Sequence, residues 1–367
     1  MRPVSLYVHV PFCRRRCPYC TFYHVPLGDR YRESSLVDSL VREFESAASG
    51  IGEPFVVPTV YIGGGTPTTI GFDALRRILG AVASRLDPGG AEITVEMNPE
   101  DVDEVVLDEA AGAGVNRVSL GVQSMSGTAQ EILGRCPPEV NRRALGLVAG
   151  RFENFNADIL AGIPGAPPGG LAATLAAVDE YRPSHYSVYC LEPGGDIAEP
   201  VSGFFRDVDP DRSAEEYLEA CAALGARGYG HYEVSNFAIP GRECAHNFVY
   251  WRGSEYLGIG PGAHSFIGGE RFRNVASVDL YIGRSAGDPD GIRRYDRRGA
   301  EEIALERIML GLRTAAGVSL SSIAAPPDTI EEIRAEGFAL VEEGRLRLTD
   351  RGYLVLNEIV QRLIRGG

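Results

Sequence analysis

The chain has 367 residues, a formal net charge of −14 and an ordinary globular composition in which 44% of the residues are hydrophobic. This length suits one large domain with a smaller one, and the sequence has no apolar run near 18 residues, which excludes a membrane span. All 36 basic residues are arginines, which excludes mechanisms that need a lysine, such as a Schiff base or a Walker-type phosphate loop. The acidic balance disfavours a dedicated nucleic-acid substrate, because proteins that bind nucleic acid usually carry a basic patch.

Short apolar or β-branched segments alternate with longer helix-like segments over the first 190 residues. Alternation of this kind is typical of βα units around a parallel sheet. The predicted fold is therefore α/β, a partial (β/α)6 barrel, and a helix at 213–227 with a strand-like segment at 231–235 can add a seventh unit. The six expected strands lie at 5–10, 59–62, 92–96, 117–121, 156–161 and 185–191, and the helices at 30–49, 72–85, 102–113, 139–151 and 170–181.

The pattern changes after residue 235, so we expect three parts, at 1–235, 236–299 and 300–367. The middle part is expected to be a loop-rich extension that ends in a linker at 283–299, which is rich in Gly, Asp and Arg. In the last part, helices, a strand–turn segment and a final helix predict a small α+β domain of the winged-helix type. Such domains often bind DNA, but fold does not imply function, and in an acidic chain we interpret this one as a structural module or a cap over the barrel. Its expected elements lie at 300–314, 328–343, 344–352 and up to 364.

Three cysteines lie within eight residues near the start of the chain. Cys13, Cys17 and Cys20 have the spacing C-x3-C-x2-C, and soft thiolates select iron–sulfur clusters, zinc or copper. Closed clusters and structural zinc sites normally have four protein ligands, so three ligands predict a centre with one open position. A zinc ion with a distant fourth ligand and chance clustering are the alternatives. A disulfide framework is disfavoured, because the sequence shows no secretory segment and its other cysteines are scattered. These are Cys136, Cys190, Cys221 and Cys244.

Polar or glycine-rich residues directly follow four of the predicted strands. In barrel folds the loops at the carboxyl ends of the strands form the active-site face. We therefore expect these loops to converge on the cysteine segment. They are Gly63–Gly65, Asn98-Pro99, Gln123-Ser124 and Gly162–Pro164.

Together these segments resemble the radical S-adenosylmethionine (SAM) superfamily, in the group that contains oxygen-independent coproporphyrinogen III oxidase and the heme chaperone HemW. The resemblance spans residues 4–360, and its motifs occur in the order that the family has. Each motif is weak by itself, whereas the ordered set is specific. The motifs are YVHVPFC at 7–13, YIGGGTP at 61–67, EMNP at 96–99, RVSLGVQS at 117–124, LGR at 133–135 and DILAGIP at 158–164.

The resemblance implies a [4Fe–4S] cluster on Cys13, Cys17 and Cys20, with SAM chelating the fourth iron and being cleaved to a 5′-deoxyadenosyl radical. The intervening Arg14–Arg16 would offset the negative charge of the cluster, unless they form a solvated loop. The resemblance also implies nine SAM contacts, whose carboxylate, amide and guanidinium groups suit the ribose, amine and carboxylate of SAM. Taken one at a time, each contact residue is also explained as a strand-end cap, a tight turn or a surface charge. They are Tyr7, Tyr19, Gly64, Gly65, Thr66, Glu96, Gln123, Arg135 and Asp158.

Two positions depart from the family pattern. Thr21 stands where the family usually has Asp after the third cysteine, and Pro137 stands where it usually has His after Leu-Gly-Arg-x. Neither change removes a cluster ligand. The second puts in doubt any role of that histidine in binding substrate or heme.

Two features place the resemblance closer to the HemW branch than to the oxidase. The oxidase carries a substantial extension before its cysteines, whereas only twelve residues precede Cys13 here. The segment HNFVYW at 246–251 also resembles the heme-associated signature of the HemW branch. His246 is the candidate heme-iron ligand, and Asn247, Tyr250 and Trp251 complete the candidate heme site with flat aromatic surfaces. The alternative for His246 is a packed, hydrogen-bonded core residue.

The resemblance therefore implies a heme chaperone that binds heme and delivers it to apo-hemoproteins, with a [4Fe–4S] cluster and SAM as cofactors. A cytoplasmic location is expected, because the chain begins with a strand-like segment instead of an export signal. The alternative is an enzyme that oxidatively decarboxylates coproporphyrinogen III. A tRNA-modifying radical SAM enzyme is a third reading, which the acidic charge disfavours. The sequence does not decide whether SAM is cleaved or only bound.

Overall fold

The computed structural model of the protein describes residues 1–28, 30–191, 203–284 and 292–365. At its centre lies a sheet with the strand order β11-β12-β10-β9-β8-β7-β6-β2-β13-β14-β15-β16. Six of these strands are parallel neighbours that alternate with helices along the chain. They are β2 (Ser5–Val10), β6 (Thr59–Gly64), β7 (Glu92–Met97), β8 (Arg117–Gln123), β9 (Phe155–Ala161) and β10 (His185–Cys190).

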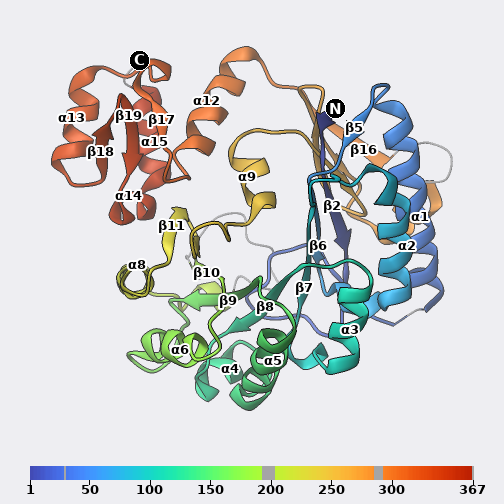
Figure 1. Ribbon diagram of the computed structural model, residues 1–367. Coiled ribbons are helices and arrows are strands. Elements are labelled where there is room, and N and C mark those ends of the chain that lie inside the picture. The colour runs from blue at the N-terminus through green and yellow to red at the C-terminus, as the bar shows by residue number, and fades with distance from the viewer. Residues whose placement is uncertain (29, 192–202, 285–291, 366–367) are drawn as a thin grey trace.

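The helices that follow these strands lie along the outer side of the curved sheet (Figure 1). The strands are covered on both faces, so they are nearly continuous buried runs, and β8 is buried at every residue except Gln123. The α/β fold, a partial (β/α)6 barrel, is confirmed, with all six strands in the expected order. The helices are α1 (Arg30–Gly50), α2 (Phe72–Val82), α3 (Glu104–Gly112), α4 (Gly127–Ile132), α5 (Pro138–Arg151) and α6 (Gly170–Asp179).

The expected seventh unit forms in a different way. A helix, α8 (Pro210–Ala226), and a strand, β11 (Gly230–Glu233), are both present. However, β11 pairs antiparallel with β12 (Asn236–Ala238), which in turn pairs antiparallel with β10. The seventh unit is therefore a hairpin at the sheet edge.

Residues 236–299, expected to be loop-rich, contain strands that continue the central sheet. Strand β13 runs parallel to β2, with Tyr256 opposite Ser5, and the next three strands follow antiparallel. These strands are only four or five residues long, too short to show a clear period of two. The expected linker contains β16, and its residues 285–291 lie outside the described residues. The elements are α9 (Ala245–Trp251), β13 (Tyr256–Ile259), β14 (His264–Ile267), β15 (Glu270–Asn274), α10 (Val278–Arg284) and β16 (Arg293–Asp296).

A buried carboxyl group joins this second half of the sheet to α1. Glu43 is 3% exposed and accepts hydrogen bonds from the backbone N–H of Gly260 at 2.9 Å and from Asn274 Nδ2 at 2.7 Å. The hydroxyl of Tyr281 donates a further bond to the same side chain. Burial raises the pKa of Glu43, and these three donors oppose that shift. The three donors lie after β13, on β15 and on α10, so one side chain fixes the added strands to the barrel.

The C-terminal part folds as a small α+β unit with an antiparallel sheet in the order β17-β19-β18. The helix expected at 328–343 ends at Ala335, because Gly337 takes a left-handed φ of 79° and the chain then turns into β18. The unit lies near α8 and β11 (Figure 1), where His231 Nδ1 is 2.8 Å from Asp350 Oδ1. Its elements are α12 (Ala300–Gly311), β17 (Val318–Ser319), α13 (Pro327–Ala335), β18 (Ala339–Glu342), β19 (Arg345–Leu348), α14 (Asp350–Leu354) and α15 (Leu356–Arg365).

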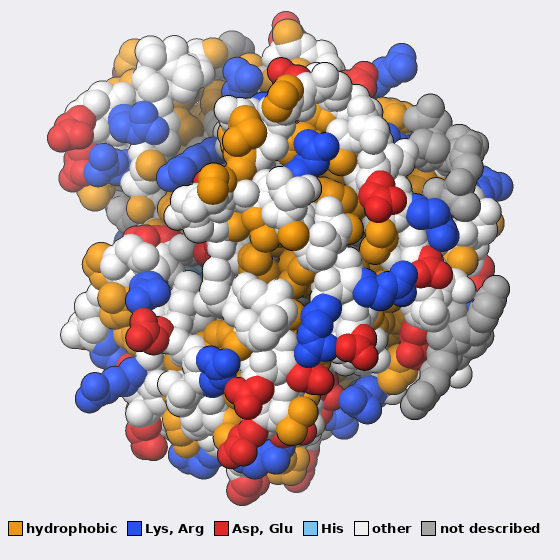
Figure 2. Space-filling view, turned by 45° about the vertical axis from the view of Figure 1, so that its right-hand side comes forward, with side chains coloured by type: hydrophobic (Ala, Val, Ile, Leu, Met, Phe, Trp, Pro, Cys, Tyr) orange, Lys and Arg blue, Asp and Glu red, His pale blue; other side chains and the backbone are white. Residues whose placement is uncertain are grey.

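The surface carries charges of both signs. On the face shown in Figure 2, arginine and carboxylate side chains are interspersed. Among the described residues, each helix is too short or too polar to cross a bilayer.

Replacing Glu43 by Ala should lower the free energy of unfolding by about 3 kcal/mol, because three buried donors lose their acceptor. Urea unfolding checks this. The matched control is Asp38→Ala on the same helix, whose side chain is 43% exposed and paired with Arg77. That change should cost less than about 1 kcal/mol. Equal losses in the two variants would show that Glu43 does not hold the added strands.

Candidate functional site

The three clustered cysteines lie on a loop that begins at the end of β2. A short strand, β3 (Phe12–Cys13), pairs with β4 (Val25–Pro26) and closes this loop at its base. Cys13, Cys17 and Cys20 are half-buried free thiols, and all three line one cavity of about 390 Å³. The cavity lies at the carboxyl ends of the parallel strands, where the sequence places it.

The glycine triplet after β6 lets this loop pack directly on the sheet. The backbone N–H of Gly65 donates to the carbonyl of Val10 at 2.7 Å, and that of Thr66 donates to the carbonyl of Phe12 at 2.7 Å. A Cβ on Gly65 would lie 2.6 Å from the carbonyl oxygen of Phe12. A Cβ on Gly64, at φ 110°, would lie 2.5 Å from the ring of His9. Glycine is required at both positions, because a side chain at 65 would push the cysteine loop away and a side chain at 64 would collide with the ring of His9.

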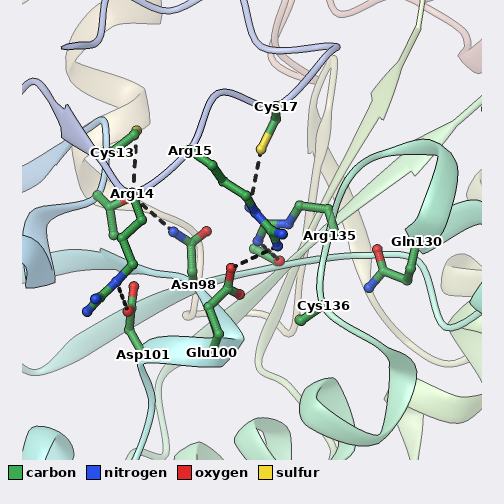
Figure 3. Close-up of polar contacts among 12 residues, drawn as sticks. Cys13, Arg14, Arg15, Cys17, Asn98, Glu100, Asp101, Gln130, Arg135 and Cys136 are labelled. Atoms are coloured by element: carbon green, nitrogen blue, oxygen red, sulfur yellow. Dashed lines mark hydrogen bonds and ion pairs between the residues drawn. The ribbon is translucent and has the colours of Figure 1, made fainter. Parts of the chain in front are cut away.

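Polar contacts through Thr66 connect Asn98, at the end of β7, to the thiol of Cys13. Asn98 Nδ2 donates to Thr66 Oγ1 at 2.9 Å, and Thr66 Oγ1 lies 3.7 Å from Cys13 Sγ (Figure 3). Asn98 was expected near the site through its strand-end position but not as a contact residue. The sequence does not indicate that Asn98 contacts Thr66, because only the fold brings these two side chains together.

Two arginines of the run between the cysteines form ion pairs with carboxylates. Arg14 Nε lies 3.0 Å from Asp101 Oδ1, and an Arg15 terminal nitrogen lies 3.4 Å from Glu100 Oε1 (Figure 3). Their side chains are 62% and 53% exposed, so these pairs anchor the loop and contribute little stability. Arg135, in contrast, contacts a thiol, because its Nη1 lies 3.8 Å from Cys17 Sγ. Its Nη2 donates to the carbonyl of Gly121 at 2.7 Å.

Three thiols that line one cavity are a donor set that fits an iron–sulfur cluster or a zinc ion, because both take thiolate ligands. Burial raises the pKa of Cys13 to about 11 and also raises that of Cys20. A bound metal would therefore have to displace protons from these thiols.

Two carboxyl groups, from β7 and β9 on either side of β8, face the same cavity. Glu96 accepts hydrogen bonds from the Tyr61 hydroxyl at 2.9 Å and from the Gly64 N–H at 3.1 Å. Asp158 accepts from Asn156 Nδ2 at 2.8 Å. Burial, together with the charge of Asp158, raises the pKa of Glu96 to about 7, and burial also raises the pKa of Asp158. A ligand that brings a cationic or hydroxyl group would be favoured here, because it would stabilise both carboxylates.

The structure brings eight of the nine expected SAM contacts into this cavity. Tyr7 is the exception, because its hydroxyl lies 3.0 Å from His9 Nδ1 and the ring lines a second cavity. Tyr61 was not expected, and lines the first cavity next to Glu96. The eight residues are Tyr19, Gly64, Gly65, Thr66, Glu96, Gln123, Arg135 and Asp158.

In this structure His246 is a packed, hydrogen-bonded core residue, which is the alternative that the sequence left open. The side chain is 1% exposed, with Nδ1 2.7 Å from Thr59 Oγ1 and Nε2 2.9 Å from the hydroxyl of Tyr250. Both ring nitrogens are therefore occupied within the fold. Glu92 on β7 accepts hydrogen bonds from the first backbone N–H groups of α9 and holds the ring in place. Asn247 and Trp251 lie on the same short helix, and neither lines the two cavities described, whereas Tyr250 lines the second one.

The two departures from the family pattern leave the cysteine loop intact. Thr21 is exposed and lines the cavity. Pro137 directly precedes α5, and the neighbouring Cys136 is buried with its sulfur 3.3 Å from Asn141 Oδ1.

Two family models match the chain. One, described as the radical SAM superfamily, matches residues 7–178, and the other, described as the HemN C-terminal domain, matches residues 300–355. A solved structure of coproporphyrinogen III oxidase (HemN) from Escherichia coli, titled a radical SAM enzyme, aligns with a TM-score of 0.82 and 23% identity. The alignment covers 99% of this chain and 90% of that chain. This likeness shows a shared fold.

Curated relatives match over nearly the full length. The heme chaperone HemW of Mycobacterium tuberculosis (strain CDC 1551 / Oshkosh) is 35% identical over 374 residues, which cover 99% of this chain and 95% of that protein. The heme chaperone HemW of Bacillus subtilis (strain 168) is 32% identical over 381 residues, which cover 97% of each chain.

Replacing Cys13, Cys17 or Cys20 by Ala should each abolish the loading of about four irons per chain on anaerobic reconstitution. Iron analysis and visible absorbance check this. Cys136→Ser is the matched control, because its sulfur faces Asn141, and this variant should load iron like the parent chain. Equal loss of iron in the control would contradict the assignment.

The raised pKa of Glu96 should make the cofactor-free protein less stable as the pH rises. The folded state keeps a proton on Glu96 up to a pH of about 7, whereas the unfolded chain releases it near its ordinary pKa of 4.5. Stability from this group is therefore complete below pH 4.5 and lost through pH 7, by at most about 3 kcal/mol. Urea unfolding at pH 5 and pH 8 should show a smaller loss in Glu96→Gln. An identical pH dependence in parent and variant would show that the group titrates normally.

Proposed function

Since the chain belongs to the HemW family within the radical SAM superfamily, we propose that it is a heme chaperone that binds heme and delivers it to apo-hemoproteins. The observation that carries this proposal is the full-length similarity to relatives named heme chaperone HemW, at 35% and 32% identity. We also propose a cytoplasmic location, which suits an oxygen-sensitive centre.

The strand-end cavity would hold the resident cofactors, a [4Fe–4S] cluster and SAM. Cys13, Cys17 and Cys20 would be the three protein ligands of the cluster, and the fact that all three line one cavity supports this assignment. When bound, a cluster with an open iron supplies a coordination site for SAM and single electrons.

The residues around the cavity would bind and orient these groups. The guanidinium of Arg135, which lies against Cys17, would offset the negative charge of the thiolates. Glu96 and Asp158 would accept hydrogen bonds from the amine or ribose hydroxyls of SAM. The exposed backbone of Gly64 and Gly65 would allow close approach, while the same glycines keep the cysteine loop in contact with the sheet.

The alternative function is oxidative decarboxylation of coproporphyrinogen III. The structural likeness to HemN, at 23% identity, concerns the fold and does not favour this chemistry over heme transfer. Only a measured activity separates the two.

The proposed function predicts that heme added to the purified protein gives a Soret band with a saturable stoichiometry. It also predicts no conversion of coproporphyrinogen III to protoporphyrinogen IX when the reconstituted protein is supplied with SAM and a reductant. Cys13→Ala is the control, because it should lose iron–sulfur absorbance and keep the Soret band. Sustained turnover of coproporphyrinogen III by the parent chain would overturn the proposal and support the alternative.

A further inference from the structure

A second cavity, of about 610 Å³, lies beside the cofactor cavity, and Thr21 and Phe22 line both. This volume lies within the range of sites for small organic ligands. Its walls come from β2, from the end of the cysteine loop and from the strands of residues 256–294. Those strands belong to the half of the sheet that the cysteine and SAM motifs do not involve.

Three side chains form a row across the strands of this cavity. His264 on β14 lies directly opposite Arg273 on β15, and Arg273 lies directly opposite Arg294 on β16. Directly opposed residues of antiparallel strands point to the same face, with Cβ atoms about 5 Å apart. All three are exposed and line the cavity. One imidazole and two guanidinium groups therefore stand side by side on one wall.

No carboxylate of the described residues pairs with either of the two arginines. Within the described part of the chain, Arg273 has no hydrogen bond or ion pair, and the guanidinium of Arg294 donates to the backbone oxygen of Arg293 at 3.0 Å. Like charges in directly opposed positions destabilise a sheet. An anionic ligand would remove this repulsion, and guanidinium groups bind carboxylates through paired hydrogen bonds.

His264 differs from the other histidines, all six of which lie in the described residues. Each of the other five has a hydrogen-bond partner on at least one ring nitrogen, and four of them have a partner on both. His264 has none. Desolvation of the ring and the neighbouring Arg273 and Arg271 lower the pKa of His264. A neutral imidazole with both nitrogens available is suited to bind iron.

Aromatic rings supply a flat apolar surface next to this row. Phe22 is 70% exposed and lies in the wall shared by both cavities. Tyr250 and Tyr256 line the second cavity, with ring centroids 4.7 Å apart at a steep angle. His246 holds the hydroxyl of Tyr250 at 2.9 Å. His246 thus acts as a positioning residue for a wall of this cavity.

If the protein carries heme, as proposed above, the heme needs a binding site, and we propose that it binds in this second cavity. His264 ligates the iron, Arg273 and Arg294 bind the propionate carboxylates, and the ring of Phe22 packs against the macrocycle. The ligand is thus an iron-containing planar macrocycle with carboxylates, and it lies next to the cofactor cavity across the Thr21–Phe22 segment.

The test is a titration of the full-length protein with ferric heme and, separately, with iron-free protoporphyrin IX. His264→Ala should weaken heme binding at least tenfold and shift the Soret band, while protoporphyrin IX binds within twofold of the parent. The double variant Arg273→Gln/Arg294→Gln should weaken both ligands at least tenfold, because both carry propionates. Arg242→Gln is the matched control, an exposed arginine that does not line this cavity, and it should change neither affinity.

The outcomes separate this site from the proposed function. If the parent binds heme, and His264→Ala and the double arginine variant both bind it with unchanged affinity and spectrum, the site is wrong and the chaperone function stands. If His246→Gln, with unchanged circular dichroism, abolishes the Soret shift and His264→Ala does not, the ligand is not His264. If the parent itself fails to bind heme, the proposed function fails together with this site.

Discussion

The close contact between the cysteine loop and the glycine triplet is the constraint on which the site depends. Gly65 has no room for a Cβ against the backbone of Phe12, and Gly64 lies under the ring of His9. Two backbone hydrogen bonds, from Gly65 and from Thr66, then hold the loop over the ends of β2 and β6. In this position its three thiols line the same cavity as the carboxyl groups of Glu96 on β7 and Asp158 on β9.

The cavity beside the cysteine loop holds several acidic groups, and a ligand with a cationic group would balance their charge. Two carboxyl groups with raised pKa values and two thiols with raised pKa values face one half-buried guanidinium, that of Arg135. The second cavity has the opposite character, with two arginines opposed across neighbouring strands. One segment, Thr21–Phe22, lies between the two. The fold thus places a cavity lined by carboxyl and thiol groups next to a cavity whose wall carries two arginines.

Much of the barrel follows from local sequence patterns, and much of the second half does not. Strands such as Ser5–Val10 are continuous apolar runs that the sequence shows directly, because parallel strands are buried on both faces. The strands from Tyr256 to Asp296 are too short to show a period, and their pairing depends on contacts such as that of Glu43 with Asn274, 231 positions apart. The row of His264, Arg273 and Arg294 exists only through the register of three strands. The family resemblance predicted Glu96 and Asp158, whereas the burial of His246 depends on Thr59 and Tyr250.

The most direct test of this account is anomalous diffraction at the iron edge from anaerobically grown crystals of the reconstituted protein. The account predicts a compact iron cluster within bonding distance of Cys13, Cys17 and Cys20, with Gly65 still in contact with the backbone of Phe12. Iron bound at other side chains, or a cysteine loop displaced from the glycine triplet when iron is present, would contradict it.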